Sequence, residues 1–361
     1  GSFLLDGELP PGRSQSTLVD GQPSSQQQLT PGSVIQGGIG SSLLYLVNTN
    51  DLPHIIHKHT VDYKEPKADC IEDGNMVNFV DDGTAYISDK DPQIVSQKLT
   101  CHYNKIEEYM HSNKLVINSD KTHLLVMAGR GAAAAKRMEV QVQAGQDMID
   151  QSESEKLLGG IIHQSGRWNE MVKNSKSSII CQLAGRLNGL KKLKQADFKS
   201  KLTVATAVVQ SKIQYLLPLY GGAPDYLIRA IQVQQLKAAR FVCGYSSYYW
   251  STEKLLRACG WLSVRQQEFY STTLLAHKIV TTSLPHNIWS DMVHPHPVNT
   301  RAALQGQIRF SNTYKGFSEL TRNSFKYRAQ SYYSRIDVSI RRQPLQAFKI
   351  KLKQFTIRNS W

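Results

Sequence analysis

The stretch Met76–Ser88 constrains the fold of this chain most, because it combines two short β-prone runs with an acidic tip. Asp82-Gly83 is a strong turn dipeptide, and it follows Asp81 directly. Residues compatible with strands lie on both sides of this point: Val77, Phe79, Ala85 and Ile87. The pattern predicts a β-hairpin whose tip carries two adjacent carboxylates.

The acidic pair Asp81-Asp82 has two interpretations on these residues alone. Polar turn residues are commonly solvated, and an Asp-Asp-Gly sequence needs no further function. Alternatively, Mg²⁺ binds one or two carboxylates together with substrate phosphate oxygens, and the ion offsets the repulsion between the two acids. The hairpin alone favours the solvated turn.

The neighbouring motifs favour the second interpretation. Phe79-Val80-Asp81-Asp82 resembles the aromatic-x-Asp-Asp box of reverse transcriptases. Other segments resemble further boxes in the same order: Gln36-Gly37, Asn50-Asp51-Leu52-Pro53, Asn113–Asn118 with Lys121-Thr122, and Lys156–Ile161. The chain therefore resembles the C-terminal part of a reverse transcriptase from a non-LTR (LINE-like, jockey-like) retrotransposon.

The resemblance implies an RNA-directed DNA polymerase that transfers nucleotides to a primer 3′-hydroxyl, with Mg²⁺ or Mn²⁺ as cofactor. Asp81 would be the principal metal ligand and Asp82 the second one, while Lys121 would assist the departing pyrophosphate. The remaining site residues fall into two groups: Gln36, Gly37 and Phe79 at the nucleotide and template, and Leu158, Gly159 and Gly160 at the primer end. For Lys121 a solvated turn, and for the glycines a β-bulge, remain open.

The fold that the resemblance implies is α+β, a right-hand polymerase palm followed by an α-helical thumb. Residues 1–165 would form a partial palm (an antiparallel sheet with helices), 166–290 the helical thumb or connection, and 291–361 a separate basic C-terminal region. Apolar periodicity predicts four helices, within 40–50 (buried), at 92–110, at 202–220 and at 224–242, and a C-terminal helical stripe of Phe348, Leu352 and Phe355. Strands are predicted at 122–127, 138–143 and 157–162.

The charge is divided unevenly along the chain. Residues 1–130 hold 10 Lys and Arg against 16 Asp and Glu (net −6), residues 131–361 hold 33 against 13 (net +20), and the sum is +14. Such a distribution suits a protein that handles a polyanion. The resemblance implies an RNA template, a DNA primer and deoxynucleoside triphosphates as partners. Lysines that would contact the nucleic-acid backbone cluster in the thumb region: Lys191, Lys192, Lys194, Lys199 and Lys201.

The cysteines and histidines suggest no closed metal site or disulfide framework. Five cysteines are scattered and form no Cys-x-x-Cys pair, which favours a reducing compartment. His54, His57 and His59 lack the spacing of a zinc site and fit a polar loop. No apolar run is long enough to span a membrane. An intracellular protein of nucleus and cytoplasm is what the resemblance implies.

One departure from the family concerns the metal site. Nothing in residues 1–35 resembles the upstream box that supplies a third carboxylate, because Asp6 and Asp20 lack its hydrophobic context. We therefore expect a fragment that does not polymerise by itself. A decayed or domesticated nucleic-acid-binding protein without catalysis is the alternative. A metal-dependent phosphohydrolase is disfavoured, since no His/Asp ligand set accompanies the acidic pair.

Overall fold

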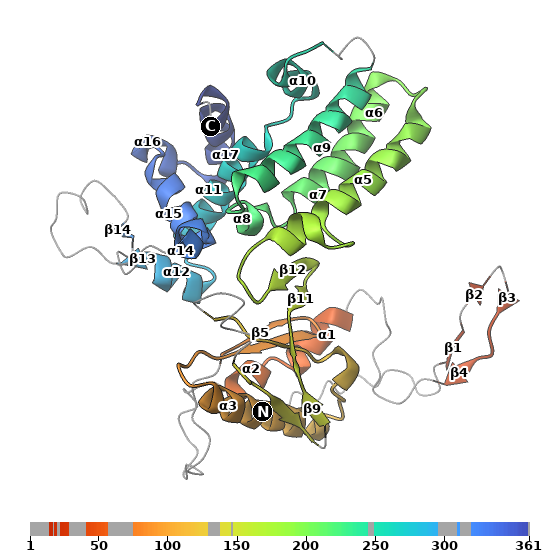
Figure 1. Cartoon of the computed structure of the whole chain (residues 1–361), viewed down its shortest axis with the longest axis vertical. Coiled ribbons are helices and arrows are strands. Elements are labelled where there is room, and N and C mark those ends of the chain that lie inside the picture. Colours follow the sequence, from red (N-terminus) through yellow and green to blue (C-terminus); the bar gives the residue numbers. More distant parts are fainter. Residues whose placement is uncertain are drawn as a thin grey trace. The chain divides into compact units, whose positions relative to one another are not determined.

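A computed structural model gives the chain a mixed α+β fold with two compact units (Figure 1). It describes residues 14–16, 18–19, 22–28, 41–56, 75–128, 138–145, 147–244, 249–294, 309–310 and 319–359. Gly1–Leu124 and Met138–Gln151 form the first unit, while Leu125–Arg137 and Ser152–Trp361 form the second. Within the second unit, the 154–163 hairpin and the C-terminal helices both pack with the central helices.

The first unit combines small hairpins with one long helix. Its described elements are β1 (Ser14–Gln15), β2 (Leu18–Val19), β3 (Gln22–Pro23), β4 (Gln27–Gln28), α1 (Ser41–Asn48), α2 (Leu52–Ile55), β5 (Asn75–Phe79), β6 (Asp82–Tyr86), α3 (Pro92–Ser112), the 3-10 turn η1 (Ser119–Lys121), β8 (Val142–Ala144) and β9 (Asp147–Ile149). Each sheet in the described part of this unit has two antiparallel strands. The larger sheet of a polymerase palm is not seen among these residues.

Helix α3 confirms the helix predicted at 92–110. The Asp91 side chain accepts a hydrogen bond from the Gln93 amide at 2.9 Å, and Pro92 occupies the first turn, so the start is fixed by an N-cap. The Ser96 and Thr100 hydroxyls, one turn apart, accept the amides of Gln141 and Gln143 at 3.3 and 3.1 Å. Strand β8 is therefore attached to α3 along one edge.

The Asn50–Pro53 segment has a structural role in the first unit. The Tyr109 hydroxyl on α3 donates to Asp51 Oδ1 at 2.5 Å, and Leu52 is 2% exposed. Helix α1 confirms the helix predicted within 40–50, but the expectation that it is buried is wrong. Leu43 is 65% exposed and Val47 is 58% exposed, because apolar periodicity does not show what packs against a helix.

The second unit is mainly helical. Its described elements are β11 (Ser154–Leu157), β12 (Gly160–His163), the π-turn η2 (Glu170–Asn174), α5 (Ile179–Leu190), the 3-10 turn η3 (Lys191–Leu193), α6 (Phe198–Ala205), the π-turn η4 (Thr206–Gln210), α7 (Ser211–Gln214), α8 (Leu217–Tyr220), α9 (Asp225–Cys243), α10 (Thr252–Cys259), α11 (Val264–Thr282), α12 (His286–Met292), β13 (Val293–His294), β14 (Arg309–Phe310), α14 (Glu319–Asn323), α15 (Phe325–Ser334), α16 (Val338–Arg341) and α17 (Leu345–Arg358). Two short strands, β7 (Leu124–Leu125) and β10 (Gln151–Ser152), fall at the division between the units. Helices α5, α6, α7 and α9 run alongside one another in Figure 1.

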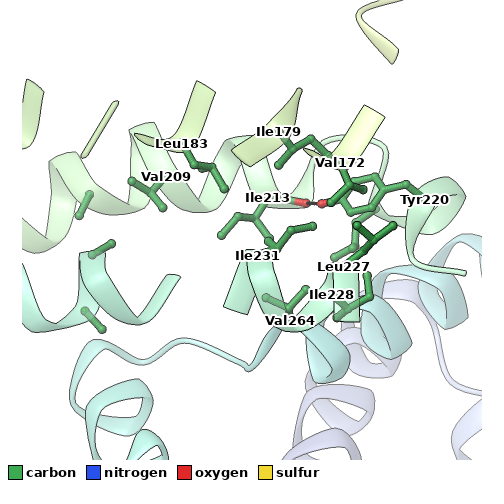
Figure 2. Packing of buried hydrophobic residues seen from close by; sticks show 14 of the residues in the cluster. Val172, Ile179, Leu183, Val209, Ile213, Tyr220, Leu227, Ile228, Ile231 and Val264 are labelled. Carbon is green, nitrogen blue, oxygen red and sulfur yellow. Dashed lines mark hydrogen bonds between the residues drawn. The ribbon is translucent and has the colours of Figure 1, made fainter. Parts of the chain in front are cut away.

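A first core cluster fills the space between α5, α6–α7 and α9 (Figure 2). Its centre is fully buried and includes Val172, Leu183, Val209, Ile213, Tyr220 and Ile231. Helix α7 ends at Gln214, which leaves carbonyl groups of its last turn unpaired. The Tyr220 hydroxyl donates to one of them, the Ile213 carbonyl, so the break between α7 and α8 is satisfied inside the core. The predicted helix at 202–220 therefore forms, with its break at 215–216.

A second core cluster joins α11 to α15 and α17. Phe269, Ala276 and Ile279 on α11 pack with residues of the C-terminal helices, which are Ala329, Tyr333, Phe348 and Leu352. The predicted stripe on α17 is confirmed, since Phe348 and Leu352 are fully buried and Phe355 packs against them. The 345–358 helix is thus part of the second unit's core.

Stability of the second core cluster is expected to depend on pH through His277. The ring stacks on Phe348 with 3.7 Å between centroids, and its Nδ1 lies 3.1 Å from the Tyr333 hydroxyl. Burial lowers the pKa of His277 below 6.5. The contribution of neutral His277 to the free energy of unfolding is therefore fully present above pH 6.5. As the pH falls from there toward the folded-state pKa, the free energy of unfolding should decrease by at most about 1.4 kcal/mol per pH unit.

The measurement is urea unfolding of the chain and of His277→Gln between pH 8 and pH 5. The variant retains a hydrogen-bonding group but does not titrate, so its free energy of unfolding should fall less steeply with acid. Equal pH slopes for the two proteins would contradict the prediction.

The cysteines differ from the sequence-based expectation at one position. Cys101 on α3 is disulfide-bonded, whereas Cys181, Cys243 and Cys259 are free thiols. Disulfide pairing depends on the distance between Cα atoms in the fold, which the scattered spacing does not reveal. Among the described helices, none is both long and apolar enough to cross a bilayer.

Candidate functional site

Strands β5 and β6 form the predicted hairpin, but its turn lies elsewhere than expected. Phe79 pairs with Asp82 and Asn78 pairs with Gly83, so the two turn residues are Val80 and Asp81. The expected turn at Asp82-Gly83 is wrong, because Gly83 lies within the strand. A Cβ atom at Gly83 would approach the Met76 side chain to 2.8 Å, so the glycine makes room for a cross-strand neighbour.

The hairpin turn contains an unusual backbone conformation. Val80 has a φ of 57°, in the left-handed region that β-branched residues rarely adopt. Such conformations persist only where the surrounding structure requires them, and they concentrate at functional sites. Asp81 is the second residue of this turn. Phe79 precedes the turn, Asp82 follows it, and the two residues pair with each other across the strands.

The acidic tip is open to solvent. Asp81 and Asp82 are exposed, and Phe79 is 60% exposed on the face it shares with Asp82. On α1, the pKa of Tyr45 is raised by burial and, to a lesser degree, by the negative charge of Asp81, which places that carboxylate near this helix. Exposure of both acids fits a solvated turn as well as a metal site open to substrate.

Lys121 does not lie at the mouth of a strand as expected. It ends the 3-10 turn η1 and is exposed, and the strand that follows is limited to Leu124–Leu125. Within the described residues, no hydrogen bond or ion pair joins Lys121 to Asp81 or Asp82. Gln36 and Gly37 lie outside the described residues, as do His57 and His59.

The Leu158–Gly160 segment is a second hairpin and not one continuous strand. Leu157 pairs with Gly160, so Leu158 and Gly159 form a two-residue turn, with φ values of 47° and 77°. Positive φ at both central residues is the feature of type I′ hairpins, whose twist matches that of the flanking strands. The expectation of two glycines within a strand is wrong, because Gly159 serves the turn.

Side chains of this same chain, Tyr215 and Leu216, closely approach the backbone at these glycines. The Tyr215 hydroxyl donates to the Leu158 carbonyl at 2.5 Å, and the Tyr215 ring would lie 3.5 Å from a Cβ at Gly159. At Gly160, a Cβ would approach Leu216 Cδ1 to 2.8 Å. The turn therefore sits against the break between α7 and α8, where Leu216 itself has a φ of 58°.

The predicted lysines form an exposed group on the second unit, which we call the lysine ridge: Lys191, Lys192, Lys194, Lys199 and Lys201. Four of them are exposed, while Lys201 is half-buried with its Nζ 5.7 Å from the Phe241 ring centre. The one acid in this segment, Asp197, caps α6 by accepting the amides of Lys199 and Ser200. The Ser200 side chain, and then the amides of Ser200 and Lys199, lower the pKa of Asp197 by hydrogen bonding to its carboxylate.

The sequence did not indicate several residues that lie near the two hairpin turns. Tyr45 lies near Asp81, Tyr215 holds the Leu158 turn, and Lys212 lies against Tyr215 with its Nζ 5.8 Å from the ring centre. Tyr215 is 57 residues from Leu158, so no local pattern indicates their contact. The position of Lys212, a charged residue within an otherwise apolar helical segment, is the sequence feature that could have indicated it.

Comparison of the chain with models of known families, with curated proteins and with solved structures finds no match. In the described part of the chain, no group of three or more His, Cys, Asp or Glu residues gathers as metal ligands would. Asp81 and Asp82 supply two carboxylates, which suits an ion that takes its other oxygens from substrate and water.

Proposed function

We propose that the acidic hairpin is the metal-binding tip of a nucleotidyl-transfer site, in a reverse transcriptase of the non-LTR retrotransposon kind. One observation carries the proposal: adjacent carboxylates stand at a turn whose first residue, Val80, adopts a backbone conformation that valine disfavours. A turn that only had to be solvated would not require this conformation, since Asn or Gly would form it without strain.

The residues of the chain would act in separate ways. Asp81 and Asp82 offer exposed carboxylate oxygens to Mg²⁺ or Mn²⁺, and the exposed Phe79 ring borders the nucleotide and template. The ion, when bound, stabilises charge on the attacking and leaving oxygens. Lys121 offers a positive charge to pyrophosphate, and the Leu158–Gly160 turn contacts the primer end. On this proposal the first unit belongs to a palm and the second to a thumb, with RNA template and DNA primer as partners.

Metal binding at the tip gives the direct test of the proposed site. Asp81→Asn is expected to weaken Mn²⁺ binding by about tenfold or more, because one charged oxygen ligand is lost. Water-proton relaxation of the Mn²⁺-loaded chain measures this without requiring catalysis, and Mg²⁺ should compete for the ion. Asp147→Asn is the matched control, since Asp147 is also an exposed acid beside a hairpin turn. Equal Mn²⁺ affinity in the chain and in both variants would overturn the proposed site.

A nucleic-acid-binding protein without catalysis is the second candidate function. The exposed lysine ridge favours it, because backbone contacts by lysine need no catalytic acid. Duplex binding that weakens with salt and is unchanged by Asp81→Asn, with no Mn²⁺ bound at the tip, would select this function. We expect no primer extension by the 361-residue chain in either case, so extension that Asp81→Asn abolishes would show that the two carboxylates suffice.

A further inference from the structure

Three cationic side chains of the second unit, each on a different element, lie near enough to interact electrostatically in the region of the Leu158–Gly159 turn. Lys156 lies on β11, Arg186 on α5 and Lys212 on α7. The Arg186 guanidinium is held in place, because its Nη1 donates to the Val208 carbonyl at 2.6 Å. That carbonyl belongs to the π-turn η4, where the hydrogen-bond register of the helix changes. The sequence motifs account for none of these three positions as a group.

The three residues of this group are positively charged, and no carboxylate in the described part of the chain is paired with them. Burial lowers the pKa of Lys212, and the positive charges of Arg186 and then Lys156 lower it further. Glu155 precedes Lys156 in the strand and therefore points to the opposite face. No ion pair in the described part of the chain joins any of the three cations to a carboxylate. Three converging cations without an acid favour an anionic ligand.

Tyr215 links the Leu158–Gly159 turn to Lys212. Tyr215 follows Lys212 by three residues, and its hydroxyl bonds the Leu158 carbonyl at 2.5 Å. Lys156 lies two residues before Leu158 on the same hairpin, opposite Ile161. Lys156 is therefore near the turn along the hairpin, and Lys212 lies against the tyrosine that contacts the turn. Arg186 is fixed one helical turn before Lys212, through the Val208 carbonyl.

We propose that Lys156, Arg186 and Lys212 form a phosphate-binding site that takes a backbone phosphate of bound nucleic acid beside the Leu158–Gly159 turn. This inference rests on the proposed function, which brings the primer end to the turn. A phosphodiester offers oxygens that accept from several donors at once, and guanidinium and ammonium groups suit it in a sequence-independent way. Helix α5, which carries Arg186, leads directly into the lysine ridge, so one duplex backbone can contact both.

The test is the salt dependence of binding to a short fluorescent RNA–DNA duplex, measured by anisotropy with the full chain. The double variant Lys156→Gln/Lys212→Gln is expected to bind about tenfold more weakly near 0.1 M salt and to lose roughly 1–2 from the slope of log K against log salt. Arg186 is left unchanged, because it also supports η4. The control is Lys254→Gln/Lys278→Gln, which removes the same charge from α10 and α11, where both lysines are exposed.

A second measurement reports on the site itself. In protein labelled with 3-fluorotyrosine, the Tyr215 resonance, assigned with Tyr215→Phe, should shift on adding inorganic phosphate and on adding duplex, but not in the Lys156/Lys212 variant. A shift with phosphate but not with duplex would overturn the nucleic-acid assignment. Duplex binding with equal slopes in both double variants would overturn the site while leaving the proposed function standing. A chain that binds no duplex would refute both.

Discussion

Replacing Arg328 with methionine is expected to lower the free energy of unfolding of the second unit by about 3–5 kcal/mol, because a buried carboxylate loses its counter-charge. Arg328 is 6% exposed and Glu268 is 1% exposed. The Arg328 guanidinium donates to Glu268 Oε1, and through Nη2 to the carbonyls of Pro218 and Leu219 at 2.6 and 3.0 Å. Urea unfolding followed by circular dichroism measures the loss.

The size of this effect follows from what Arg328 holds together. Its Nε donates to the Asn323 carbonyl at 3.1 Å, and Glu268 also accepts from the Tyr332 hydroxyl at 3.0 Å. The group thus joins α8 of the first core cluster to α11 and α15 of the second. Without arginine, the carbonyls at the end of α8 lose their donor as well, and unpaired buried acceptors are themselves destabilising.

Two further variants test whether the loss of stability comes from the buried ion pair and not from removing a long cationic side chain as such. Lys326→Met removes a neighbouring cation whose partner, Asp291, is 57% exposed, and should cost less than about 1 kcal/mol. Arg328→Met/Glu268→Gln should recover part of the loss, since no charge is then left buried. Burial raises the pKa of Glu268, so the deficit of Arg328→Met should shrink as pH falls and the carboxyl takes up a proton. A deficit equal to that of Lys326→Met would refute the argument.

The helices were the most predictable part of the fold, because their apolar spacing is local information. Pro224 marks the start of α9, and the apolar residues Leu227, Ile231, Ala238 and Val242 are buried, as their spacing indicates. Ile228, Gln235 and Ala239 are buried as well. The stripe on α17 was predictable for the same reason. By contrast, α1 has the apolar residues of a buried helix but is exposed at Leu43 and Val47, since burial depends on partners elsewhere in the chain.

The two hairpins show what the sequence leaves undetermined. In both, the prediction gave the glycines the wrong role, whereas the turns are Val80-Asp81 and Leu158-Gly159. Turn position depends on which residues pair across the strands, and a shift of one residue reverses both faces. At Leu158 the pairing is further fixed by Tyr215, a contact that composition and periodicity do not contain.

The candidate site was predictable in its residue types but not in its arrangement. The adjacent acids and their exposed position follow from a polar hairpin tip, and the lysine ridge follows from charge clustering. The electrostatic interaction of Lys212 with Arg186 and Lys156 was not predictable, because a strand and helices far apart in sequence supply the three residues. Charged residues that only the fold brings near one another show no periodic pattern and no fixed spacing in the sequence.

Gly222→Ala is expected to destabilise the second unit by about 1–3 kcal/mol or more, because the added methyl group has no space. A Cβ at this position would lie 2.1 Å from the Asn323 carbonyl oxygen and 3.0 Å from Arg328 Nε. The nearest neighbour is backbone, so a change of rotamer cannot relieve the clash. Relief requires α14 to move away from the turn after α8, which would also weaken the hydrogen bonds of Arg328.

The matched control is Gly185→Ala, the same substitution on the same unit with the opposite expected sign. Gly185 lies in the middle of α5 and is exposed, and a Cβ there would meet nothing within 4 Å. Alanine favours an exposed helix interior over glycine by about 0.5–1 kcal/mol, so this variant should be more stable than the parent chain. If both substitutions shifted the urea midpoint in the same direction, the close packing of Gly222 against α14 could not be correct.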